Sequence, residues 1–238
     1  MTAFADLRPA ESPPSRQTLT VMAVLVAANV LLFMLIAEDV LKGGGLVSHD
    51  QAVLTWFVDH RTQGLIHVAK VVSTLGSFVS LAVMAAVLGL WLWRRRWRVA
   101  LAAAPLVALV LASLASTTAK AVFGRARPPV TVHAEEVSLK AFPSGHATDA
   151  AAFFLSAALV LAITVAHRRA TQVALVVAGL GLAAMVGLSR LVLGVHWLSD
   201  VVAGWALGSA FALTIVATSW QLTTHGHSGV AKKNDPPV

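Results

Sequence analysis

The chain has 238 residues, of which 57% are hydrophobic and only 12% are charged. A soluble domain carries about twice that charged fraction, so the composition excludes an ordinary soluble protein and leaves no room for a separate soluble domain. Cysteine is absent, which excludes disulfides and thiolate metal sites, and the net charge of +7 is typical of the positive-inside bias of a membrane protein rather than of nucleic-acid binding.

Six stretches along the chain have the roughly 20 apolar residues that a helix needs to cross the hydrocarbon core of a bilayer. Pro105 lies inside the third stretch, where neighbouring helices can accommodate a kink. The predicted fold class is therefore all-α, a polytopic membrane bundle of six transmembrane helices. The expected spans are 19–37, 71–93, 99–118, 147–166, 173–188 (prolonged toward Leu193) and 197–220.

The segments between and beyond these spans are shorter or more polar. Residues 48–60 mix apolar and polar side chains and are too short to span, so we expect an interfacial helical segment there, with a partly buried loop helix as the alternative. The proline-containing start and the polar end of the chain are typical of disordered termini. The expected organisation is a disordered cytoplasmic N-terminus at 1–17, a membrane domain at 18–222 and a disordered cytoplasmic tail at 223–238.

Lysine and arginine residues indicate the orientation, because cytoplasmic loops of membrane proteins carry an excess of both. With the N-terminus inside, the short inner segments are densely basic, whereas the basic residues of the outer segments are spread over longer loops. We therefore expect both termini to be cytoplasmic. The basic residues of the inner segments are Arg8, Arg16, Arg94, Arg95, Arg96, Arg98, Arg168, Arg169, Lys232 and Lys233.

Three clusters of polar residues fall on the expected outer side. Lys120, Arg127 and Arg190 can converge there on an anion, because the arginine fork pairs bidentately with phosphate oxygens and lysine adds a point charge. A Pro-Ser-Gly-His sequence opens the fourth span, where Ser144 can cap the helix, Gly145 lets the backbone approach an anion and the helix dipole favours negative charge. The pattern predicts a phosphate-binding cradle.

The same clusters contain groups that can perform chemistry. His196 and Asp200 are four residues apart at a helix start, so the carboxylate can hold one ring nitrogen and leave the other free to attack. His146 is available as a proton donor. Taken alone, each group has an ordinary explanation, such as a snorkelling cation, a helix cap or a structural ion pair. The three clusters together, on one side of the membrane, predict phosphoryl transfer.

These clusters resemble the signature motifs of the type 2 phosphatidic acid phosphatase superfamily, which includes bacterial lipid phosphatases, undecaprenyl diphosphate phosphatases, glucose-6-phosphatase and the vanadium haloperoxidases. No motif position departs from the family pattern, and the resemblance extends over residues 50–220. The first motif is matched by Lys120, Arg127 and Pro128, the second by Pro143 to His146, and the third by Ser189, Arg190, His196 and Asp200.

The resemblance implies a metal-independent membrane lipid phosphatase without a cofactor, which works through a phosphohistidine and is inhibited by vanadate. His196 would attack phosphorus, Asp200 would orient His196, and His146 would protonate the leaving oxygen before water hydrolyses the intermediate. The implied phosphate-binding groups are Lys120, Arg127, Ser144, Gly145 and Arg190.

Several lipid substrates fit this expectation, and each would keep its tail in the bilayer while it enters laterally. Undecaprenyl diphosphate, phosphatidylglycerol phosphate, phosphatidic acid and diacylglycerol pyrophosphate are compatible. The expected location is a bacterial inner (plasma) membrane, with the active site on the extracytoplasmic face. A lipid phosphotransferase using the same site is the alternative, whereas intact His146, His196 and Asp200 argue against a scaffold or transporter. The oligomeric state is left open, and a homodimer is compatible with the sequence.

Asp149 is a further candidate, although it is not a motif position. It lies one turn after His146 at membrane depth, where ionisable groups are functional candidates by default. It could tune His146 or pair with Lys120 or Arg125, and its role is left open.

Other residues outside the motifs have structural interpretations. Loop residues His133, Glu135 and Glu136 could shape substrate entry, but exposed loop polarity is the preferred explanation. Glycines in the fifth span are expected to permit close packing of helices, as small residues do in membrane bundles. These glycines are Gly179, Gly181 and Gly187.

Overall fold

The computed structural model describes residues 13–95, 97–137 and 140–231, and within these ranges the chain is helical and contains no strand. The expectation of an all-α protein is therefore confirmed. Two short 3-10 turns, η1 (Gly45–His49) and η2 (Val130–Val132), lie in connecting loops. The helices are α1 (Arg16–Lys42), α2 (Asp50–His60), α3 (Gln63–Leu75), α4 (Phe78–Arg94), α5 (Val99–Phe123), α6 (Gly145–Thr164), α7 (Arg169–Val192) and α8 (Leu198–Ala231).

Five of the described helices, α1, α5, α6, α7 and α8, are each long and apolar enough to cross a membrane, and α3 with α4 makes a sixth span if the pair counts as one. The span expected over 71–93 is not one continuous helix, because α3 and α4 meet there at a bend of 52°. The break falls at Gly76 and Ser77, and the Ser77 hydroxyl accepts a hydrogen bond from the Ser80 N–H. A serine cap of this kind starts a new helix.

Both ends of the bundle differ from the expected boundaries. α1 begins at Arg16, where the Ser15 hydroxyl accepts a hydrogen bond from the Thr18 N–H; residues 1–12 lie outside the described part of the chain. The last span was expected to end at residue 220, yet α8 is helical as far as Ala231. Each residue added to an existing helix gains a hydrogen bond, so the helix continues into the tail that was expected to be disordered. Residues 232–238 are not described.

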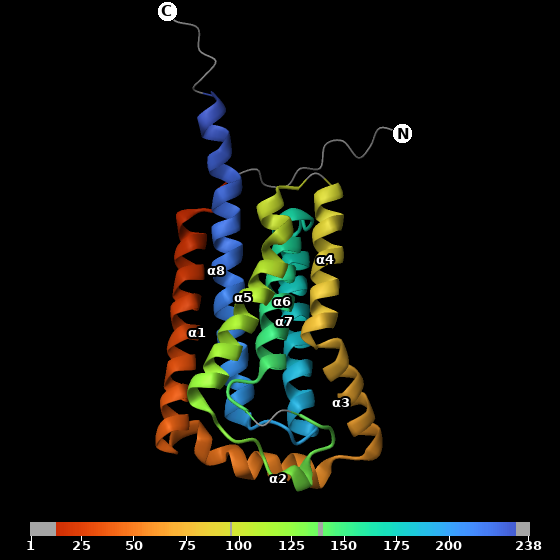
Figure 1. The fold of residues 1–238 in the computed structure, drawn as a ribbon. Coiled ribbons are helices and arrows are strands. Elements are labelled where there is room, and N and C mark those ends of the chain that lie inside the picture. The colour runs from red at the N-terminus through yellow and green to blue at the C-terminus, as the bar shows by residue number, and fades with distance from the viewer. Residues whose placement is uncertain (1–12, 96, 138–139, 232–238) are drawn as a thin grey trace, which may run out of the picture.

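Helix α6 occupies the centre of the bundle and packs against α5, α7 and α8 (Figure 1). In the most apolar part of each helix, 78% of the residues of α6 are buried, compared with 11% of those of α1. Two glycines of α8 allow this helix to approach α6 closely. A Cβ at Gly208 would lie 2.2 Å from the Thr148 carbonyl oxygen, and one at Gly204 would lie 2.8 Å from that of Ser144. This Gly-xxx-Gly contact brings the start of α8 against the start of α6.

The glycines of α7 follow the expectation in part. A Cβ at Gly179 would lie 2.7 Å from the Phe154 carbonyl oxygen, and one at Gly187 would meet the Trp205 ring at 2.4 Å, so close packing at both positions is confirmed. The expectation is wrong for Gly181, where a Cβ would meet no atom within 4 Å. That position faces open space along the helix.

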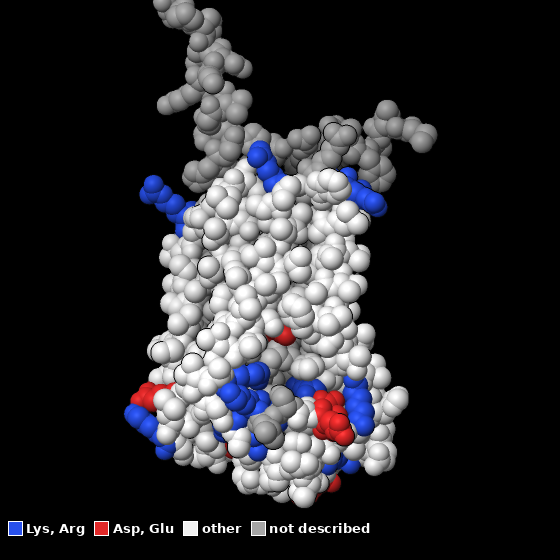
Figure 2. All heavy atoms as spheres, viewed as in Figure 1, with Lys and Arg blue, Asp and Glu red and all other residues white. Residues whose placement is uncertain are grey.

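Helix α2 lies across one end of the bundle (Figure 1). Its Asp50 and Leu54 side chains are buried, whereas its other residues are exposed or half-buried, so the expected helical segment at the end of the bundle is partly buried. Figure 2 shows a broad belt of the visible face almost without charged residues, and most charges gather at the end that carries α2. A belt of this kind matches the hydrocarbon part of a bilayer.

Candidate active site

The three clusters meet at the end of the bundle closed by α2. Lys120 lies in the last turn of α5, Ser144 precedes α6, and His196 lies in the short connection between α7 and α8. Backbone hydrogen bonds join them, because the Ser144 N–H donates to the Asp200 carbonyl over 2.9 Å and the Lys120 ammonium donates to the carbonyls of Ala141 and Pro143. Residues from distant parts of the sequence are thus held in one place.

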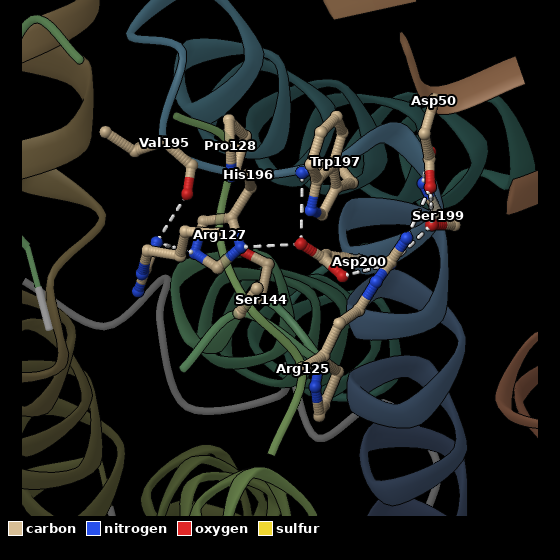
Figure 3. Close-up of polar contacts among 12 residues, drawn as sticks. Asp50, Arg125, Arg127, Pro128, Ser144, Val195, His196, Trp197, Ser199 and Asp200 are labelled. Atoms are coloured by element: carbon tan, nitrogen blue, oxygen red, sulfur yellow. Dashed lines mark hydrogen bonds and ion pairs between the residues drawn. The ribbon is translucent and has the colours of Figure 1, made fainter. Parts of the chain in front are cut away.

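His196 is held between a carboxylate and an arginine (Figure 3). Its Nδ1 lies 3.2 Å from Asp200 Oδ2, and its Nε2 lies 2.9 Å from Arg127 Nη1. A guanidinium can only donate, so Nε2 accepts and the ring proton is on Nδ1, which donates to Asp200. The ring is therefore neutral, with a lone pair on Nε2. This is the tautomer that a nucleophilic histidine requires.

Burial and nearby cations keep the His196 ring neutral. Burial is the main reason that the pKa of His196 lies well below its usual value of 6.5, and the charges of Arg127, Lys120 and Arg190 lower it further. Burial, and after it the charge of Arg190, lowers the pKa of Arg127 to about 10, which leaves its guanidinium charged at neutral pH. The site thus combines a neutral imidazole with fixed positive charge.

The His196 ring is expected to stay neutral as the pH falls below 6.5, because a lowered pKa extends the range of the neutral form toward acid. Any acid limb of kcat/KM that reports this ring therefore lies below pH 6.5. NMR titration of labelled histidine rings, assigned by comparison with a His196→Gln variant, measures the pKa directly. Arg127→Gln should raise it, since a nearby positive charge is removed. A wild-type ring that titrates at the usual value contradicts this description of the site.

A buried ionic network supports Asp200 from the side opposite to His196 (Figure 3). Arg125 Nη1 lies 2.6 Å from Asp200 Oδ1, and Arg125 Nη2 lies 2.6 Å from Asp50 Oδ2. Asp50 also accepts hydrogen bonds from the N–H and hydroxyl of Ser199 at 2.9 and 2.5 Å. The network ties α2 to the start of α8 and fixes the orientation of the Asp200 carboxylate.

The sequence pattern did not indicate this network. By sequence, Arg125 is one of the basic residues spread over the outer loops, and Asp50 is one of the polar residues of the segment 48–60. Asp50 and Ser199 are 149 residues apart, and no local spacing relates them. The available signal was an acidic residue at the start of a short, partly apolar helix, which is too general to single out a partner.

Arg190 and Ser144 carry polar atoms without a partner among the described residues. Arg190 is only 1% exposed, and its Nη1 bonds to the Ser73 hydroxyl and the Glu135 carboxylate, while its Nε has no partner. Ser144 stands at the N-cap of α6, but its buried hydroxyl makes no capping hydrogen bond, so the expected cap is wrong. Buried polar groups are normally paired, and the oxygens of a bound phosphate would satisfy both atoms.

His146 and Asp149 complete the polar lining from α6. The His146 ring lies close enough to the charges of Arg190, Arg127 and Lys120 to interact with them electrostatically. It interacts in the same way with the His196 ring. Asp149 is buried, with a hydrogen bond to Ser113 and the charge of Lys120 nearby, and its Oδ1 has no partner in the described part of the chain. Of the two expected partners of Asp149, Lys120 acts on it electrostatically, whereas Arg125 is engaged with Asp50 and Asp200.

Fold and site together define a multi-pass membrane protein with a histidine and several cations gathered at one end of its helices. The family model described as the PAP2 superfamily matches residues 101–224, which is more than half of the chain. The protein therefore belongs to the PAP2 superfamily, and the resemblance found in its motifs is confirmed.

Two curated relatives carry lipid phosphatase names. The chain is 33% identical over 117 residues to a lipid A 1-phosphatase of Rhizobium etli, an alignment that covers 44% of each protein. It is 29% identical over 188 residues to phosphatidylglycerophosphatase B of Bacillus subtilis, which covers 76% of this chain and 88% of that protein. The chain thus spans less than half the length of the lipid A 1-phosphatase that it matches.

Solved structures of the same fold exist. A PAP2 type phosphatidylglycerolphosphate phosphatase from Bacillus subtilis superimposes with a TM-score of 0.74 at 23% identity and covers 88% of this chain and 97% of its own. LpxE from Aquifex aeolicus superimposes with a TM-score of 0.55 at 19% identity and covers 70% and 94%, respectively. At these identities the likeness establishes the fold.

Proposed function

We propose that the protein is a membrane lipid phosphatase that removes phosphate from a lipid phosphomonoester or diphosphate through a phosphohistidine at His196. One observation carries the proposal: a neutral imidazole with an accepting Nε2 lies against Arg127 and is held by Asp200. A nucleophile oriented by a carboxylate and bordered by phosphate-binding cations is the arrangement that phosphoryl transfer to histidine requires.

The geometry supports a two-step mechanism. The phosphate binds to the cations and to the Ser144 hydroxyl and Gly145 N–H, and Arg127 transfers its hydrogen bond from His196 Nε2 to a phosphate oxygen. Nε2 then attacks phosphorus, the bond from phosphorus to the lipid oxygen breaks, and His146, in its protonated form, gives that oxygen a proton. Asp200 stabilises the positive charge that develops on the His196 ring. In the second step His146 removes a proton from water, which attacks phosphorus and releases phosphate and free His196.

The proposed reaction is independent of metal ions. Lys120, Arg127 and Arg190 would stabilise the charge that develops on the phosphate oxygens, a task that a metal ion performs in many phosphatases. Arg190 is buried and Arg127 partly so, and charge stabilisation is stronger in a desolvated site than in water. Vanadate, which adopts a trigonal bipyramidal geometry, is expected to bind the same cradle and inhibit.

The substrate class is proposed from the position of the site and from the relatives. The cradle lies at one end of the apolar spans, where a lipid headgroup would be found with its tail still in the bilayer. The curated relative with the longer alignment is named a phosphatidylglycerophosphatase, so phosphatidylglycerol phosphate is the first substrate to test, followed by undecaprenyl diphosphate, phosphatidic acid and diacylglycerol pyrophosphate. We place the site on the extracytoplasmic face of a bacterial plasma membrane, because the dense basic segments lie at the opposite end.

Purified protein in detergent with excess EDTA is expected to release phosphate from at least one of these lipids, and vanadate is expected to stop the release. The released phosphate is measured with malachite green, and the lipid products are identified by mass spectrometry. A reaction abolished by EDTA and restored by a divalent metal contradicts the metal-free mechanism. Phosphoryl transfer to an added acceptor lipid, without release to water, identifies a lipid phosphotransferase instead.

A further inference from the structure

The loop between α5 and α6 places a carboxylate on one of the phosphate-binding arginines. Glu135 Oε1 lies 2.5 Å from Arg190 Nη1, and the two side chains are 24% and 2% exposed, respectively. Carboxylate and phosphate oxygens use the same donors of a guanidinium. The Glu135 carboxylate therefore occupies a position in the cradle that a phosphate oxygen would take.

The backbone of the loop holds Glu135 in this place. The N–H of the preceding residue, Ala134, donates to the Leu193 carbonyl over 2.9 Å. Gly194 follows in the left-handed conformation with φ 68°, and a Cβ there would lie 2.5 Å from the Val132 carbonyl oxygen. These contacts seat the loop on the α7–α8 connection, so the backbone holds Glu135 within reach of Arg190.

The same loop lines a cavity of about 1030 Å³ that reaches the cradle at Arg127. Basic and acidic side chains lie close together at this end of the molecule (Figure 2). Glu135 and Glu136 both line the cavity, but only Glu135 pairs with Arg190 among the described residues. An anion that enters here meets one carboxylate that competes for Arg190 and one that does not.

We propose that Glu135 is an internal competitor of phosphate, which determines how tightly the site holds substrate and product; this inference rests on the proposed function. Between turnovers Glu135 neutralises buried Arg190, whose charge is unfavourable without a partner. A substrate phosphate displaces Glu135, because it carries more negative charge and more acceptor oxygens. After hydrolysis, the returning carboxylate promotes release of inorganic phosphate.

Glu135→Gln is expected to bind vanadate and inorganic phosphate about tenfold more tightly. If Glu135 occupies Arg190 in about 90% of wild-type molecules, only about 10% of sites are open to an anion, and the apparent affinity is about tenfold weaker. Calorimetry or ligand-induced thermal shift measures the Kd of each anion without turnover, and kinetics measures the product-inhibition constant of phosphate. Glu136→Gln removes the same charge from the same cavity and should change both values less than twofold. Glu135→Asp, with its shorter side chain, should behave like Glu135→Gln.

Equal anion affinity in Glu135→Gln, Glu136→Gln and wild type overturns the inference. Wild-type anion affinity in Glu135→Asp also overturns it. The shorter carboxylate would then weaken anion binding as much as Glu135 does, so the direct contact with Arg190 would not be the cause. Both results leave lipid hydrolysis as a separate question. Conversely, tighter anion binding in Glu135→Gln combined with no hydrolysis of any lipid supports the competitor and rejects the proposed phosphatase activity.

Discussion

His196→Ala is expected to reduce lipid phosphate hydrolysis by at least about 10⁴-fold, because loss of a covalent nucleophile removes the reaction path and not a single contact. The side chain is buried, and its two ring nitrogens contact Asp200 and Arg127, which is the arrangement that the proposed attack on phosphorus uses. The wild type, quenched during turnover, should carry phosphate on nitrogen, which is stable to alkali and labile to acid. His196→Ala should carry none.

His133→Ala is the matched control for this experiment. His133 lines the neighbouring cavity, and its Nε2 donates to the Pro128 carbonyl over 2.9 Å, so its ring is bonded to the backbone of the loop. Its hydrolysis rate should remain within about threefold of the wild type. Turnover that survives His196→Ala, or phosphate recovered on another residue, would show that the assigned nucleophile is wrong.

Arg125→Gln is expected to have the second largest effect, on both stability and rate. The substitution leaves Asp50 and Asp200 buried without their cation, and breaking a buried ion pair in this way costs about 3–5 kcal/mol of the free energy of unfolding. Asp200 also loses the contact that fixes its carboxylate, so we expect kcat to fall about 100-fold while KM changes little, because Arg125 makes no contact with the proposed phosphate position. Thermal unfolding and steady-state kinetics in detergent measure the two effects.

The double variant Arg125→Gln with Asp50→Asn tests the reason for that loss. It removes one of the two stranded carboxylates and should recover part of the melting temperature but little of kcat, because Asp200 remains unsupported. Arg61→Gln is the control, since Arg61 donates to the Val192 carbonyl over 3.1 Å and pairs with no carboxylate among the described residues. An Arg125→Gln protein with wild-type kcat shows that the network serves stability alone.

The sequence by itself determined the membrane class, the approximate spans and the residues that meet in the site. Spans are readable because a bilayer imposes a length of apolar helix, which is a local property. The motif residues are readable because phosphate binding and histidine chemistry need particular side chains at particular spacings, such as His196 and Asp200 one helical turn apart. Family membership follows from the same residues and is confirmed by the match over 101–224.

Only the tertiary structure decided which groups act on those residues. Several contacts join segments that no spacing rule connects. They are the pair of Arg125 with Asp50, the contacts of Arg190 with Glu135 and Ser73, and the close approach of Gly208 to Thr148. The bend between α3 and α4 depends on the Ser77 cap, and α8 extends beyond its apolar span; hydropathy registers neither. The pattern of apolar residues indicates which segments are buried. The partner of a buried charge, in contrast, comes from whichever segment the fold brings within hydrogen-bonding distance.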